Sequence, residues 1–128
     1  MPTYFAIALG SALGGVGRYW CSGFVARHIG ETFPWGTLFV NIVGSLLIGL
    51  FATLTAPEGR LLVGPTARQF FMLGVFGGFT TFSSFSLQTL NLVQDGEWVQ
   101  ASAYIGASVV FCLIGVWGGH ALGVIINR

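Results

Sequence analysis

Polar residues that could bind a small ion gather in one uncharged stretch of this sequence. Hydroxyl side chains stand at Thr80, Thr81, Ser83, Ser84 and Ser86, and phenylalanines recur at every third position, at Phe76, Phe79, Phe82 and Phe85. Hydroxyls are neutral hydrogen-bond donors, and the edge of a phenyl ring carries a partial positive charge. The combination permits weak binding of a small anion, although the same phenylalanine spacing is also typical of plain apolar packing.

This stretch lies in the middle of an uncharged run that covers residues 69–94. A bilayer is spanned by about 20 apolar residues, so the run is long enough to cross a membrane. Gly77 and Gly78 weaken a helix at its centre, and non-helical backbone at membrane depth requires surrounding protein or a water-filled cavity. We therefore predict a membrane helix that is broken near its centre, with the break facing something polar. Carbonyl groups freed beside residues 77–81 could also coordinate a cation.

The composition predicts an all-α integral membrane protein that is embedded in the lipid bilayer. Of 128 residues, 54% are hydrophobic and only 7% are charged, whereas soluble domains carry about 25% charged residues. The sequence lacks the short alternating segments of a β-barrel. Its net charge of +1 and its lack of lysine argue against a nucleic-acid partner and against a polybasic lipid-binding patch.

Four membrane spans are expected in a single domain of residues 1–128, at about 3–25, 34–55, 67–93 and 98–126. A polar loop with Arg27 and His28 follows the first span, and residues 95–97 form a tight turn before the last. Small residues recur in the first span at Ala6, Gly10, Gly14 and Gly17, a spacing that lets another helix approach closely. Both termini fall on one side of the membrane. The arginine bias between the two sides is weak, which permits insertion in both orientations.

Two polar side chains lie well inside predicted spans. Arg18 costs at least about 2.5 kcal/mol at the centre of a membrane helix, so it snorkels to the surface, pairs with backbone carbonyls, or raises the potential at the mouth of an anion path. Asn41 shares a helical face with Thr37, and its amide either bonds a neighbouring helix or donates to an anion.

The last span carries a stripe of small and weakly polar residues. This stripe consists of Ala101, Tyr104, Ser108, Cys112, Gly115 and Gly119. Such a pattern is typical of close helix packing, and it is also expected of a polar track beside a pathway. The two cysteines, Cys21 and Cys112, are interpreted as small buried residues.

No combination of residues typical of an enzyme is present. The acidic residues Glu31, Glu58, Asp95 and Glu97 all lie in loops or at span ends. No histidine, cysteine and acid cluster has metal-ligand spacing, and no serine has an obvious activating base. The lack of an embedded carboxylate also argues against a small dual-topology multidrug exporter. A non-transporting membrane subunit, whose glycines and hydroxyls merely pack, is a further alternative.

Three stretches of the sequence resemble the small fluoride-channel family (Fluc, also called CrcB). They are residues 77–86 (GGFTTFSSFS), 14–19 (GGVGRY) and 36–41 (GTLFVN). The length and the number of spans match as well, and the resemblance covers essentially the whole chain. It implies a fluoride-selective channel for passive export of fluoride across a bacterial cytoplasmic membrane, which confers fluoride resistance.

The resemblance also implies an antiparallel dual-topology homodimer with two pores. Phe82 and Phe85 of both subunits would line each pore, and Arg18 would lie near the vestibule. Carbonyl oxygens of Gly77 and Thr80 from both subunits would hold a structural sodium ion at the dimer centre. The other implied pore residues are Asn41, Thr37, Ser83, Ser84, Tyr104 and Ser108. Cys112 stands where the polar track of some relatives continues with a hydroxyl, and Gln88 stands where an acidic residue often follows the third-span motif, so no track role is assigned to Cys112 and no charged role to Gln88.

Overall fold

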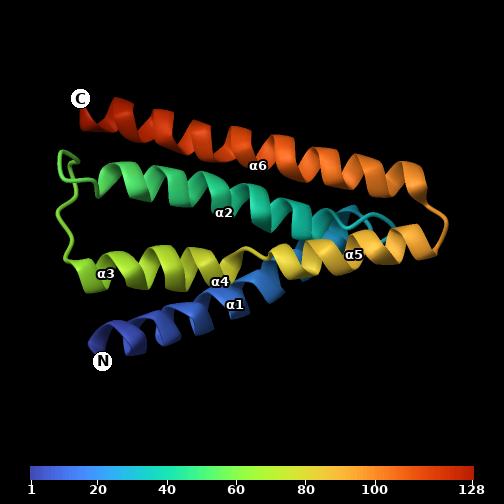
Figure 1. Ribbon diagram of the computed structural model, residues 1–128, viewed down its shortest axis with the longest axis horizontal. Coiled ribbons are helices and arrows are strands. Elements are labelled where there is room, and N and C mark those ends of the chain that lie inside the picture. Colours follow the sequence, from blue (N-terminus) through green and yellow to red (C-terminus); the bar gives the residue numbers. More distant parts are fainter.

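The computed structural model describes all 128 residues, and they form helices joined by short loops. The elements are α1 (Pro2–Ile29), α2 (Trp35–Leu54), α3 (Pro65–Gln69), the π-helical segment η1 (Phe70–Phe76), α4 (Gly77–Phe79), α5 (Phe82–Gln94) and α6 (Trp98–Asn127). In Figure 1, α6 and α2 run side by side, and the row formed by α3, α4 and α5 lies along the other side of α2. α1 crosses this row, and both chain termini lie at the same end, as predicted.

Three helical segments are long and apolar enough to cross a membrane: Trp35–Leu54, Pro65–Gln94 and Trp98–Asn127. Their ends lie within two residues of three of the four predicted spans, which confirms an all-helical membrane protein. α1 has 28 residues and is long enough as well, but it is not among these segments. Arg18 and several glycines lower the hydropathy of α1. The predicted membrane span at residues 3–25, and with it the total of four spans, therefore stays a prediction.

The first helix is longer than predicted, because it ends at Ile29 and not near residue 25. Arg27 and His28, which the sequence placed in a loop, form its last turn, where basic residues interact favourably with the helix dipole. Gly30 then stops the helix with a φ of 141°, a backbone angle that glycine adopts readily. A polar last turn and a polar loop look alike in sequence, so the predicted boundary was wrong.

The tight turn predicted at residues 95–97 is confirmed. Gly96 has a φ of 78°, and its N–H donates to the Val93 carbonyl oxygen at 3.0 Å. The N–H of Glu97 donates to the Leu92 carbonyl oxygen at 2.8 Å. These two bonds form a Schellman motif that closes the end of α5 and sends the chain directly into α6.

Glycines bring α1 into backbone contact with the third span. A Cβ atom on Gly14 would lie only 2.9 Å from the backbone nitrogen of Phe79, and one on Gly78 would lie 2.8 Å from the Ser11 carbonyl oxygen. A Cβ atom on Gly10 would also collide with backbone. The predicted close approach is therefore confirmed at Gly10 and Gly14, and it fixes α1 beside the point where α4 ends.

α6 packs along α2 through the glycine half of its stripe. A Cβ atom on Gly115 would lie 3.1 Å from the Ile42 carbonyl oxygen, and one on Gly119 would lie 2.8 Å from the Leu50 nitrogen. The packing interpretation of the stripe therefore holds for these glycines. Ser108, from the polar half, is also buried.

Candidate functional site

The third span is interrupted at Thr80 and Thr81, near its centre. α4 ends at Phe79, and α5 begins at Phe82. Between them the backbone is extended, with ψ angles of 160° at Thr80 and 115° at Thr81. The sequence predicted this break but attributed it to glycine, whereas Gly77 has helical angles (φ −63°, ψ −39°). The non-helical residues are threonines, whose branched side chains favour extended backbone.

Asn41 of α2 pairs with both backbone groups of Thr81. Its Nδ2 donates to the Thr81 carbonyl oxygen at 3.1 Å, and the Thr81 N–H donates to its Oδ1 at 2.7 Å. This pairing satisfies a donor and an acceptor that the broken helix cannot satisfy itself. The structure thus shows the interhelical bond that was one of the two roles considered for Asn41. Because Nδ2 has a second N–H, a role toward an anion stays a prediction.

Most hydroxyls around the break bond local backbone. Thr81 caps α5, because its Oγ1 accepts from the Ser84 N–H at 3.1 Å. Thr80 Oγ1 donates to the Phe76 carbonyl oxygen at 3.2 Å, and Ser86 Oγ donates to that of Phe82 at 3.0 Å. Ser83 is exposed, and its hydroxyl lies 3.3 Å from Thr81 Oγ1. The hydrogen bonds that these side chains make in the structure therefore stabilise the broken backbone.

Arg18 also reaches the break. Its Nε donates to the Gly78 carbonyl oxygen at 3.2 Å, and the side chain is half-buried. Of the three possibilities for this arginine, the structure therefore shows pairing with a backbone carbonyl. A role near a vestibule stays a prediction.

An open groove of about 390 Å³ lies over the break, between α2, the third span and α6. Its lining comprises Asn41, Gly44, Ser45, Ile48, Phe76, Thr80, Thr81, Phe82, Phe85, Ser108, Val109, Cys112 and Leu113. The fold thus brings together Asn41, Phe85 and Ser108, which are far apart in the sequence. Ser108 is 7% exposed, and its hydroxyl has no hydrogen-bond partner in the protein. Such a buried hydroxyl is unusual, and this one is available to a guest in the groove.

Two phenylalanines and one tyrosine form an aromatic chain beside the groove. The ring centroids of Phe82 and Phe85 lie 5.3 Å apart, and those of Phe85 and Tyr104 lie 5.0 Å apart. Phe85 is 9% exposed, whereas Phe82 is 78% exposed. Tyr104 is fully buried and donates its hydroxyl to Gln88 Oε1 at 2.8 Å. Tyr104 therefore touches the groove through Phe85 and does not line it, and its contact with Gln88 was not predicted.

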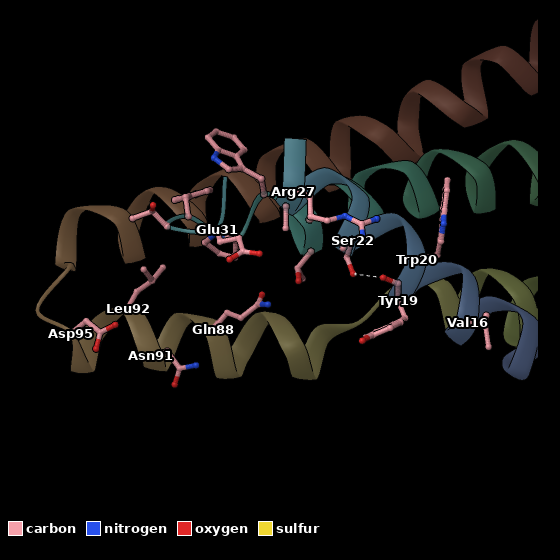
Figure 2. A pocket seen from close by; sticks show the side chains of 18 residues that line it. Val16, Tyr19, Trp20, Ser22, Arg27, Glu31, Gln88, Asn91, Leu92 and Asp95 are labelled. Carbon is pink, nitrogen blue, oxygen red and sulfur yellow. Dashed lines mark hydrogen bonds between the residues drawn. The ribbon is translucent and has the colours of Figure 1, made fainter. Parts of the chain in front are cut away.

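A second cavity, of about 790 Å³, opens where α1 and the loop after it meet the C-terminal part of α5. Figure 2 shows Arg27, Glu31, Gln88 and Asp95 around it. Thr37 lines this cavity and not the groove, although it lies about one helical turn from Asn41. Polar and charged residues contribute to its lining. The residue patterns of the sequence did not reveal this cavity, because it forms only when three segments meet.

The fold and the groove define a multi-pass helical membrane protein with a polar region in the middle of its third span. Residues 5–120 match the sequence model of the family described as CrcB-like protein, Camphor Resistance (CrcB). The chain belongs to this family, as its three sequence stretches predicted.

Relatives that carry the name fluoride-specific ion channel FluC are similar along the whole chain. A protein of Opitutus terrae is 65% identical over 127 residues, which are 99% of this chain and 96% of that relative. A protein of Rhodospirillum rubrum is 60% identical over 126 residues, or 98% of each chain. A third, of Paramagnetospirillum magneticum, is 56% identical over 128 residues and covers both chains completely.

The pairing of Asn41 with Thr81 generates a testable prediction about the break. Replacing Asn41 by alanine leaves two partly buried backbone groups unpaired, and a lost partner costs up to about 1–3 kcal/mol for each group. We expect hydrogen exchange of the Thr81 amide, measured by nuclear magnetic resonance in detergent, to become at least about tenfold faster, since 1.4 kcal/mol corresponds to a factor of ten.

The matched control is Ser45→Ala, which removes another polar side chain from the groove lining on α2 without touching Thr81. Exchange at Thr80 is the internal reference, because its N–H donates to the Phe76 carbonyl oxygen. Equal Thr81 exchange in Asn41→Ala and in the parent chain would show that this pairing does not hold the break.

Proposed function

We propose that this chain is a fluoride-selective ion channel through which fluoride leaves the bacterial cytoplasm passively, and which thereby gives resistance to fluoride. The observation that carries this proposal is the groove, where the break in the third span meets Asn41, Phe85 and Ser108. The names of the full-length relatives identify fluoride as the ion.

The chemistry of the groove suits a small anion that must keep moving. Fluoride is strongly hydrated, so removing its water in a low-dielectric place is costly. The groove offers weak neutral donors: the free hydroxyl of Ser108, the second N–H of Asn41, and the ring edges of Phe82 and Phe85. Its lining includes no lysine or arginine. Distributed weak donors offset the loss of water without trapping the ion, and conduction needs exit as well as entry.

The proposed path runs from the larger cavity to the groove. The cavity serves as a water-filled mouth, and Thr37 on its wall precedes Asn41 by about one helical turn. Tyr104 supports the path by packing on Phe85 at 5.0 Å. Ser83 and Ser84 complete the set of pore residues that the family resemblance implies, at the start of α5.

A second, antiparallel copy of the chain completes the channel in our proposal. An ion path must be closed on all sides, but the groove is open and the ring of Phe82 is 78% exposed. Only 6% of the residues in the apolar part of the third span are buried within one chain. α1 serves as the fourth span, because the bond from Arg18 to Gly78 reduces the cost of holding this charge in the membrane.

The antiparallel arrangement predicts that the chain inserts in both orientations. A reporter that is active only in the cytoplasm and one that is active only outside it should both give signal when each is fused to the C-terminus. Adding lysines at residue 128 should bias the insertion toward one orientation, since loop charge sets topology. Signal from one reporter alone in the parent chain would contradict dual topology.

A structural sodium ion fits the break in the same proposal. The Gly77 carbonyl oxygen accepts only a long contact of 3.5 Å from Thr80 Oγ1, and the Thr80 carbonyl oxygen accepts no hydrogen bond within the protein. Hard cations prefer such oxygen ligands, and a two-fold axis doubles two carbonyls to four. Sodium held there would offset the repulsion between these carbonyl dipoles and join the two copies.

If carbonyls of both copies hold sodium, the dimer should be more stable in sodium chloride than in N-methylglucamine chloride at equal ionic strength. The measurement is the melting temperature of the detergent-solubilised dimer, followed by gel filtration after heating. An identical melting temperature in the two salts would contradict a sodium ion at this interface.

The role of the two phenylalanines is tested by replacing Phe82 and Phe85 singly with isoleucine. Each change keeps the groove apolar but removes the aromatic quadrupole. We expect fluoride efflux from liposomes that contain only this protein to fall at least about tenfold for each variant, because about 1.4 kcal/mol of lost stabilisation has this effect.

Phe71→Ile is the matched control, since Phe71 packs on Phe70 and Phe76 of the same span and on Phe51 of α2 but does not line the groove. It should conduct like the parent chain. Gel filtration shows whether each variant is still a dimer. Normal efflux by folded Phe82→Ile and Phe85→Ile channels would contradict a pore lined by ring edges, and absence of efflux by the parent chain would contradict the proposed function itself.

A further inference from the structure

The guanidinium of Arg18 donates to the Gly78 carbonyl oxygen, which in an unbroken third span would accept a backbone hydrogen bond of the helix. We propose that Arg18 is a positioning residue that keeps the third span broken through its hydrogen bond to Gly78, and not through its charge. This inference rests on the proposed function, because the break forms one wall of the groove.

The hydrogen bonds around the break support this role. In a continuous helix each N–H bonds the carbonyl four residues earlier, so Thr81 would donate to Gly77 and Phe82 would donate to Gly78. Neither bond forms. The Thr81 N–H bonds Asn41 Oδ1 at 2.7 Å, and the Gly78 carbonyl oxygen accepts Arg18 Nε at 3.2 Å. A side chain of α2 therefore bonds the N–H, and a side chain of α1 bonds the carbonyl, that would pair within a continuous helix.

The packing of α1 explains why an arginine at this position reaches Gly78. The backbones of α1 and the third span meet at Ser11 and Gly78, and again at Gly14 and Phe79. Residues 11, 14 and 18 lie on one face of a helix, so Arg18 follows the last of these contacts by one turn. The long side chain lies half-buried at the end of α4 and donates to the nearest free carbonyl.

Loss of this bond favours closure of the helix. A carbonyl at membrane depth without a donor is costly, and in a continuous helix the donor to Gly78 is the Phe82 N–H. Once Phe82 donates to Gly78, the extended threonines become helical and the groove loses its floor. Arg18 competes with that closure, and a neutral donor at the same position serves equally well.

Replacing Arg18 by glutamine or by methionine distinguishes the effect of its hydrogen bond from the effect of its charge. Glutamine places its Nε2 the same number of bonds from the backbone as arginine Nε, so Arg18→Gln keeps a donor and loses the charge. Arg18→Met has a similar length and keeps neither. We expect Arg18→Met to lower fluoride efflux per folded dimer about tenfold or more, and Arg18→Gln to stay within about threefold of the parent chain. Arg60→Gln, in the loop after α2, controls for the loss of one positive charge.

A second measurement reports the backbone conformation at the break and does not depend on fluoride. Backbone chemical shifts of Thr80 and Thr81 should indicate extended residues in the parent chain and in Arg18→Gln, and helical or averaged residues in Arg18→Met. This measurement holds whether or not the chain conducts fluoride, so its outcome is independent of the proposed function.

Three results from folded variants would overturn the inference. They are extended threonines together with normal efflux in Arg18→Met, an equal loss of efflux in Arg18→Gln and Arg18→Met, and helical threonines in Arg18→Gln. If Arg18→Met does not assemble, Arg18→Gln decides alone. A folded glutamine variant with extended threonines supports positioning through the bond, and its failure to fold shows that the charge is required.

Discussion

Water cannot satisfy a broken backbone in the middle of a membrane, and this constraint governs the arrangement of the whole chain. A helix that stops at Phe79 and restarts at Phe82 leaves donors and acceptors that need partners. α2 supplies one partner through Asn41, and α1 supplies another through Arg18. The glycines that bring α1 into backbone contact with α4 are therefore part of the same solution, because a side chain reaches the break only from a helix that packs closely.

The low polarity of the membrane interior also explains why charged and neutral side chains line different cavities. The larger cavity has Arg27, Glu31 and Asp95 on its wall, near one end of the molecule. The groove over the break is lined by neutral side chains alone. A neutral lining over the break fits the proposed channel, because a fixed strong charge at membrane depth would hold fluoride too tightly to release it.

Sequence patterns predicted the apolar helices well because hydropathy and length define them directly. The break was also predicted, but on Gly77 and Gly78, since local propensity points to glycine; its position at Thr80 and Thr81 depends on Asn41, 40 residues away. For the same reason the sequence left three possibilities open for Arg18. Its partner follows from how the glycines set α1 against α4, which no local pattern contains. Asn41 and Ser108 could be proposed from their polarity inside spans, whereas the contact between Tyr104 and Gln88 arises only when α5 meets α6.

One exchange of hydrogen bonds links the two ions of the proposed channel. When Asn41 Oδ1 accepts the Thr81 N–H, the Gly77 carbonyl loses the partner it would have in a continuous helix. It thereby becomes free to serve as a ligand for a cation. The same amide has a second N–H that the Thr81 carbonyl does not use, and Asn41 lines the groove. The anion path and the cation site are therefore not independent additions to a helix bundle. In the proposed channel both would result from a single break, and a substitution that lets the third span close would remove them together.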